Sequence, residues 1–303
     1  MKRITLEFFA LSALAASGLF LTQANAAEPL SVVASFSILG DLVQVVGGER
    51  VKVTTLAGPD ADAHEFSPSP EHARAVLGAK LFVVNGLSFE PWAQKLAHSA
   101  GYKGETVVAS KGVKPRQMAA EAEHNHAETD PHAWQNPLSV VQYVGNIAAG
   151  LAKADPSGAA IYQANAQAYA QQLKDFDAQA KAQFDAIAPA KLKVITSHDA
   201  FGYLAARYSI TMLAPEGVNT DSEPSAKHVA QLIRQIKREK IKAVFVEAMS
   251  SPKLIAQLSK DAGVSVGATL YSDALSKASG PAPTYMKMMR HNLTQLVAGM
   301  QQN

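Results

Sequence analysis

Two blocks of alternating strand-like and helix-like segments constrain the fold of this chain more than any other feature. In the first block, short runs rich in β-branched residues are separated by longer segments whose apolar residues recur at helical spacing. We expect strands at 31–36, 51–57, 81–86 and 106–109, with helices between them at 38–46, 70–79 and 91–100. Strands that alternate with helices in this order form a parallel sheet covered on both faces.

The second block repeats the alternation in the C-terminal part of the chain. Strands are expected at 193–196, 210–213, 243–247 and 264–270, with helices near 225–239 and 252–261. The sequence therefore predicts an α/β fold of two lobes with parallel sheets. We place an N-terminal lobe at residues 27–155 and a C-terminal lobe at 189–303, with a connecting helix at 156–188.

The connecting segment from Gly158 to Ile187 is a strong candidate for one long helix. It contains no proline and no further glycine, and it is rich in Ala, Gln and Lys, which are mostly good helix formers. A single helix of about 30 residues would extend roughly 45 Å and could join both lobes stiffly. The alternative is two helices with a break near Asp175. Apolar residues recur at steps of three and four, which favours one amphipathic face: Tyr169, Leu173, Phe176, Ala180, Phe184 and Ile187.

The N-terminus has the three parts of a secretory signal peptide. Lys2 and Arg3 precede an apolar run at about 8–21, which is followed by small residues at 24–26. The run is shorter than the roughly 20 apolar residues of a membrane span. We therefore expect cleavage near Ala26 and a mature protein in the periplasm. Because the sequence has no cysteine, we expect neither disulfides nor a lipid on an N-terminal cysteine.

The charge balance argues against nucleic acid as a partner. The chain has 28 basic and 26 acidic residues. Binding to nucleic acid would require basic residues clustered on one face, and no such cluster is evident.

Four polar residues stand at the ends of predicted elements, where they could meet between the lobes. His64 and His198 follow strands, His132 precedes a helix, and Asp273 follows the segment 264–270. In open α/β sheets, ligands bind beyond the carboxyl ends of the strands. Three neutral imidazoles and a carboxylate suit a first-row divalent metal such as zinc. Taken alone, however, each such residue is more often an ordinary loop residue than a ligand.

The remaining histidines have other expected roles. We expect solvated or helix-capping side chains at His72, His98, His228 and His291. His124 and His126 lie in a short Ala, Glu and His segment at about 118–129, which is either a weak metal-collecting arm or a plain surface loop.

Five segments resemble the metal-binding solute-binding proteins of zinc, manganese and iron ABC importers, the cluster A-I type. They are ADAHEFSPSP, DPHAWQNP, ITSHDAFGYLAARY, SEPSAKHVAQLIRQIK and LYSDALS. The resemblance covers essentially the whole mature chain. It implies two α/β lobes joined by a rigid helix, one metal ion in the cleft between them, and delivery of that ion to a membrane permease by a monomer.

In this family, the four ligand positions correspond to His64, His132, His198 and Asp273. Members similar to the manganese proteins usually have glutamate at the third position, so His198 favours Zn²⁺. Three imidazoles also suit zinc, whereas manganese prefers more oxygen ligands. Mn²⁺ and Fe²⁺ remain the alternatives.

Two other classes of function compete with a binding protein. A metallohydrolase could use the same residue types, but catalytic zinc keeps an open coordination position and the sequence contains no H-E-x-x-H. We therefore do not expect an enzyme. An adhesin would also be exported, but no repeat in the sequence indicates one.

Overall fold

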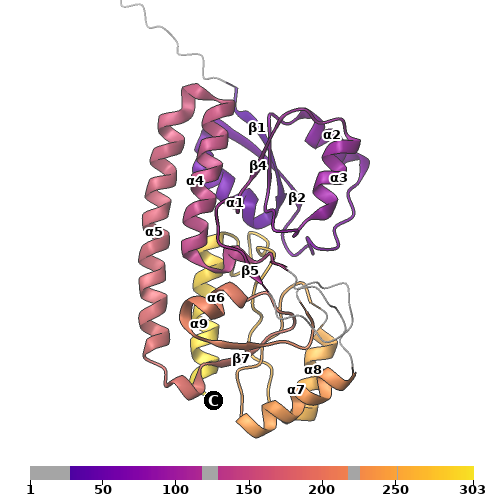
Figure 1. The fold of residues 1–303 in the computed structure, drawn as a ribbon, viewed down its shortest axis with the longest axis vertical. Helices are drawn as coiled ribbons and strands as arrows, with labels where there is room; N and C mark the ends of the chain where they lie inside the picture. Colours follow the sequence, from indigo (N-terminus) through magenta and orange to yellow (C-terminus); the bar gives the residue numbers. More distant parts are fainter. Residues whose placement is uncertain (1–27, 118–128, 218–225, 251) are drawn as a thin grey trace, which may run out of the picture.

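The computed structural model describes residues 28–117, 129–217, 226–250 and 252–303. It shows two α/β lobes stacked along one long helix, which pairs with a second helix beside the first lobe (Figure 1). The first lobe and the helix pair contain β1 (Leu30–Phe36), α1 (Ser37–Gly47), η1 (Gly48–Arg50), β2 (Val51–Ala57), α2 (Pro70–Gly78), β3 (Leu81–Val84), α3 (Pro91–Ser99), β4 (Glu105–Val108), β5 (Arg116–Gln117), β6 (Thr129–Asp130), η2 (Ala133–Gln135), α4 (Pro137–Ala154), η3 (Pro156–Gly158) and α5 (Ala159–Asp185). The second lobe contains η4 (Pro189–Lys191), β7 (Lys193–Ile195), α6 (Gly202–Tyr208), β8 (Thr211–Leu213), α7 (Ala226–Glu239), α8 (Pro252–Ala262) and α9 (Tyr285–Gln301).

The first lobe contains a four-stranded parallel sheet in the order β2-β1-β3-β4. Successive residues of a strand point to opposite faces. Val32 and Ala34 accordingly pack in the core with α1 and α4, whereas Val33 packs with residues of α2 and α3. The four strands and three helices expected in this lobe are confirmed to within two residues at each end.

Helix α5 is continuous over 27 residues. The predicted single helix is therefore confirmed, and the alternative of two helices with a break near Asp175 is wrong. At 1.5 Å per residue it extends about 40 Å, and it runs beside α4 along both lobes (Figure 1). The predicted apolar face, from Tyr169 to Phe184, is buried. The same apolar core continues from β1 through α4 and α5 to α9. The lobes therefore share one core and are not joined by a free linker.

The second lobe is less regular than predicted. β7 and β8 form a parallel pair, but the strands expected at 243–247 and 264–270 are wrong as regular strands. Those segments contribute only isolated parallel bridges: Ile195↔Val244, Val244↔Val266 and Glu247↔Leu270. The backbone N–H of Val244 donates to Lys242 within its own segment. Gly267 lies against the ring of Phe245, where a Cβ would come within 2.7 Å, and an interior glycine weakens a strand.

Helix α9 was not expected from the sequence. Thr284 caps it by accepting a hydrogen bond from the backbone N–H of Lys287. Its apolar residues recur at helical spacing and are buried: Tyr285, Met288, Met289, Leu293, Leu296 and Met300. Asn292 on the same helix bonds both the backbone N–H and the carbonyl of Tyr271, so α9 holds the segment that leads to Asp273.

Some expectations fall on parts of the chain that are not described. The signal peptide and the histidine-containing loop at 118–128 lie outside the described residues. The lobe boundaries at residues 155 and 188 stay predictions. Within the described ranges, no helix combines the length and the apolar character that crossing a membrane requires.

Candidate metal centre

His64 lies in the loop between β2 and α2, where a turn fixes its backbone. The Asp62 carboxylate accepts hydrogen bonds from the backbone N–H of His64 at 2.8 Å and of Glu65 at 3.4 Å. The indole of Trp92 in α3 donates to the carbonyl of Ala63 at 2.7 Å. The His64 ring packs edge-on against Phe89, with ring centroids 4.5 Å apart. These contacts leave the side chain 5% exposed, with Nε2 facing the other lobe.

His132 lies in a turn between β6 and η2, and Asp130 determines its orientation. One oxygen of Asp130 accepts the backbone N–H of His132 at 3.0 Å and lies 2.9 Å from the ring Nδ1. The other oxygen binds Arg116 at 3.0 Å. With Nδ1 donating to this carboxylate, Nε2 is the nitrogen that faces the cleft and can bind a metal once it has lost its proton.

His198 follows β7, and Glu247 plays the corresponding role there. One Glu247 oxygen accepts the backbone N–H groups of Ser197 and His198 at 2.9 and 3.0 Å. The other lies 2.8 Å from Nδ1 of His198. Both side chains are fully buried. His198 is therefore also oriented with Nε2 toward the cleft.

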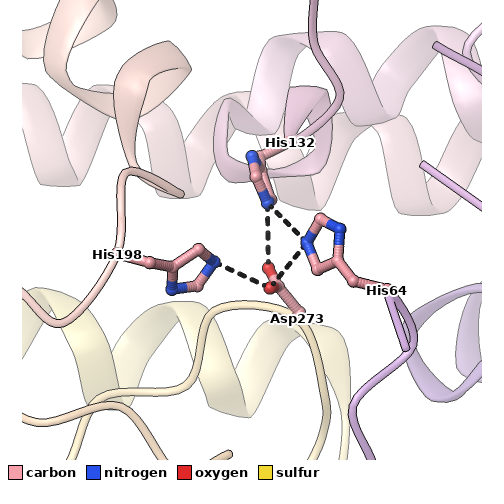
Figure 2. A group of neighbouring side chains, drawn as sticks. All are labelled: His64, His132, His198 and Asp273. Atoms are coloured by element: carbon pink, nitrogen blue, oxygen red, sulfur yellow. Dashed lines mark hydrogen bonds and ion pairs between the residues drawn. The ribbon is translucent and has the colours of Figure 1, made fainter. Parts of the chain in front are cut away.

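The structure brings the four residues predicted from the sequence into one cluster (Figure 2). Nε2 of His64 lies 3.2 Å from Nε2 of His132 and 3.3 Å from Oδ2 of Asp273. Asp273 Oδ2 is 3.0 Å from Nε2 of His198, and Oδ1 is 3.6 Å from Nε2 of His132. All four donor atoms lie within 4.8 Å of one another. A tetrahedral zinc site with bonds of about 2.0 to 2.1 Å has ligand atoms about 3.3 Å apart. The distances of 3.0 to 3.6 Å are close to this value, whereas the widest separation, up to 4.8 Å, has to shorten for all four atoms to bind one ion.

Comparison with known proteins identifies the family. The family model described as zinc-uptake complex component A, periplasmic (ZnuA), matches residues 32–299. The chain belongs to this family. The ZnuA family comprises periplasmic metal-binding components of ABC importers.

Two curated relatives span most of the chain. The manganese-binding lipoprotein MntA of Halalkalibacterium halodurans is 33% identical over 275 residues, which are 91% of this chain and 90% of MntA. The iron-binding protein YfeA of Yersinia pestis is 31% identical over 278 residues, 92% of this chain and 88% of YfeA. The expected family membership is therefore confirmed, and its named members differ in the metal they bind.

Solved structures show the same fold. The periplasmic zinc-binding protein TroA of Treponema pallidum aligns with a TM-score of 0.83 at 28% identity, covering 90% of this chain and 99% of TroA. A Mn-bound periplasmic metal-binding protein of Candidatus Liberibacter asiaticus aligns with a TM-score of 0.79 at 30% identity, covering 89% and 98%. The predicted α/β fold of two lobes is confirmed.

In this ZnuA-family protein, buried carboxylates control the protonation of the site. Burial alone would lower the pKa of His132, but the nearby charge of Asp273 and the charge and hydrogen bond of Asp130 outweigh it and raise the pKa to about 9. For His198, Glu247 and Asp273 likewise outweigh burial and raise the pKa well above its usual value. Burial would raise the pKa of Asp273, but the two charged imidazoles hold it well below its usual range. Without metal, protons on the imidazoles therefore balance the buried negative charge.

Asp130 and Glu247 are the functional residues that the sequence analysis missed. Asp130 stands two residues before His132, and Glu247 ends the segment predicted as a strand at 243–247. A metal-ligating histidine almost always donates its other N–H to a carboxylate or carbonyl. This rule could have singled out Asp130 from its spacing, whereas nothing in the sequence pairs Glu247 with His198.

The other described histidines take no part in the cluster. His72 completes the capping box of α2 by accepting the backbone N–H of Ser69 on Nδ1 at 2.9 Å, so its capping role is confirmed. His98 is exposed on α3, as expected for a solvated side chain. His228 and His291 are partly buried, and Nε2 of His291 lies 2.8 Å from the carbonyl of Thr269.

Proposed function

We propose that this protein captures one divalent transition metal ion between His64, His132, His198 and Asp273 and delivers it to the permease of an ABC importer. Zn²⁺ is the cargo we favour, ahead of Mn²⁺ and Fe²⁺. The observation that supports this most is the cluster of four donor atoms within 4.8 Å of one another, on three buried residues and the partly buried His64, with three of the atoms imidazole nitrogens. Imidazole suits zinc, while manganese prefers more oxygen.

The protein supplies a negative charge to the ion and orients the ligand atoms that bind it. Asp273 brings the one negative charge in direct contact. Asp130 and Glu247 lie 2.9 and 2.8 Å from the Nδ1 atoms of His132 and His198, which leaves Nε2 of each ring to bind metal. The buried Oδ1 of Asp273 accepts no hydrogen bond within the described residues and lies 3.6 Å from Nε2 of His132, so it is available to a cation between the two groups. Four protein ligands leave no open position for an attacking water, so we expect no hydrolase activity.

We further propose that the chain is exported, that its first 26 residues are removed near Ala26, and that it works as a monomer. No role for nucleic acid is expected, because basic and acidic residues nearly balance, at 28 and 26.

Metal analysis after stripping with a chelator tests the assignment of the cargo. We expect one tightly bound ion per chain, with zinc displacing manganese in a competition titration because three of the four donors are nitrogen. Tighter binding of manganese than of zinc would overturn the zinc assignment and leave the metal-binding function intact.

Deletion of residues 121–128 tests the role of the histidine-containing loop. We expect the tight binding event to persist, because the four candidate ligands lie outside this segment. Any weaker second binding event should disappear, since His124 and His126 are removed. Isothermal titration with Zn²⁺ measures both events, and loss of the tight event would show that the ligands are misassigned.

A further inference from the structure

The backbone on the N-terminal side of three of the four candidate ligands is held in the same way. In each case the carbonyl of the preceding residue accepts a hydrogen bond from the side-chain N–H of a buried tryptophan, asparagine or glutamine. The carbonyls are those of Ala63, Pro131 and Ser272, which precede His64, His132 and Asp273.

All of the donors belong to the first lobe. Trp92 in α3 donates to Ala63 at 2.7 Å, and Asn85 after β3 donates to Pro131 at 3.0 Å. Asn85 is itself fixed by the hydroxyl of Tyr143 in α4, which donates to its side-chain oxygen at 2.6 Å. These side chains are tied to the regular elements of the first lobe, so they hold His64 and His132 on a rigid base.

Asp273 belongs to the second lobe by sequence, and Asn292 of α9 holds Tyr271 two residues before it. The residues nearer to Asp273, however, are bound to the first lobe on both sides. Before it, the carbonyl of Ser272 accepts from Nε1 of Trp134 at 2.8 Å and from Nε2 of Gln135 at 2.7 Å. After it, Leu275 is hydrogen-bonded to two groups of the first lobe: its N–H donates to the Ser37 hydroxyl at 2.9 Å, and its carbonyl accepts from Asp60 at 3.0 Å.

His198 is held differently. Its backbone N–H and that of Ser197 donate to Glu247, and the Ser197 hydroxyl accepts from the Glu247 N–H at 3.2 Å. Asp199 donates to the carbonyl of Gly217 at 3.0 Å. These partners all belong to the second lobe.

Gln135 is a buried polar side chain that uses only one end of its amide. It is fully buried, Nε2 donates to Ser272, and Oε1 accepts no hydrogen bond within the described residues. An unsatisfied buried amide oxygen is unfavourable, and an apolar side chain of the same length would avoid it. What the amide provides is therefore its N–H donor, which ties the segment of Asp273 to the turn that carries His132.

We infer that Gln135 is a positioning residue for metal capture: it joins Asp273 to His132 and His64 as a pre-organised set of three ligands on the first lobe. His198 completes this set as the ligand whose neighbouring backbone, among the described residues, is hydrogen-bonded to the second lobe alone. The inference rests on the proposed function, because it concerns the same metal centre.

The first test compares Gln135→Met with Tyr208→Phe, using Zn²⁺ as the probe. Methionine keeps the length and removes the donor. Tyr208→Phe is the matched control, because it removes one buried hydrogen bond, 3.0 Å to Asp177 between α6 and α5, away from the cluster. We expect Gln135→Met to release Zn²⁺ roughly 10- to 100-fold faster, the range found when groups that orient metal ligands are lost. The control should release it at the wild-type rate.

Thermal unfolding with and without Zn²⁺ separates positioning from a merely structural role. A structural role would lower the Tm of both forms equally, whereas a positioning role also reduces the rise in Tm that Zn²⁺ produces. Wild-type release and an unchanged metal-induced rise in Gln135→Met would overturn the inference. Failure of the wild-type protein to bind a tight metal ion would instead refute the proposed function.

A second pair of variants tests whether three ligands belong to the first lobe and one to the second, even if Gln135→Met does not fold. His198→Ala leaves the three-ligand set intact, and His64→Ala, which likewise removes one imidazole, breaks it. We expect His198→Ala to bind Zn²⁺ at least tenfold more tightly than His64→Ala. The reverse order of affinities would overturn the inference that the first lobe carries a pre-organised set of three ligands.

Discussion

The affinity for Zn²⁺ is expected to rise steeply with pH up to about pH 9, because the metal must displace protons from the empty site. Each ligating imidazole has to be neutral. Asp273 and Asp130 raise the pKa of His132 to about 9, and Glu247 and Asp273 raise that of His198. At pH 7 both rings therefore hold protons when the site is empty. Release of about two protons makes the affinity change roughly 100-fold per pH unit.

Affinities measured between pH 7 and 8.5 decide whether the histidines of the empty site are protonated in this range. Ordinary histidines, which titrate near about 6.5, would give an affinity that levels off in this interval. The measurement is a Zn²⁺ dissociation constant from chelator competition, corrected for zinc hydrolysis, together with calorimetry in two buffers to count released protons. His98→Gln, at an exposed position on α3, is the control and should keep the wild-type slope. A plateau above about pH 7.5 would contradict the predicted protonation of the empty site.

The second large effect is expected from exchanging the imidazole of His198 for a carboxylate. His198→Glu alone would place two carboxylates together, because Oε2 of Glu247 lies only 2.8 Å from Nδ1 of the native ring. We therefore expect this single variant to bind both Zn²⁺ and Mn²⁺ more weakly. Glu247→Gln in the same chain removes the repulsion. The double variant should shift the affinity ratio of Zn²⁺ to Mn²⁺ toward manganese by roughly tenfold or more, since one nitrogen donor becomes oxygen.

A competition titration with both metals measures this ratio. The same variant should also show a shallower dependence of affinity on pH, because one fewer imidazole has to lose a proton. His98→Glu is the matched control, with the same substitution at an exposed position. An unchanged ratio and slope in the double variant would mean that His198 is not a ligand, and the cluster would have to be reassigned.

The four candidate ligands could be predicted from the sequence, whereas the carboxylates that orient two of them were not predicted. His64, His132, His198 and Asp273 could be selected because each follows or precedes a regular element, and the resemblance to a family supplied the rest. Asp130 and Glu247 were overlooked. Glu247 is 49 residues from His198, and its contact with that ring depends on how two irregular segments pack.

Regular elements were predictable where local periodicity matched the packing. The strands of the first lobe and helix α5 have patterns that one face of a sheet or helix must show when it is buried. The segments at 243–247 and 264–270 have the composition of strands, yet they form only isolated bridges. Their pairing depends on neighbours in space, such as the ring of Phe245 against Gly267.

The sequence by itself determined two α/β lobes and the types of residue available to a metal, and it favoured a continuous connecting helix, because these follow from short-range periodicity and the chemistry of single side chains. Only the tertiary structure decided which lobe holds each ligand. Trp134 and Ser272 are 138 residues apart, and their hydrogen bond ties Asp273 to the first lobe although the chain carries it in the second. Hydrogen bonds over such separations form only when the whole chain has packed, and no local pattern in the sequence encodes them.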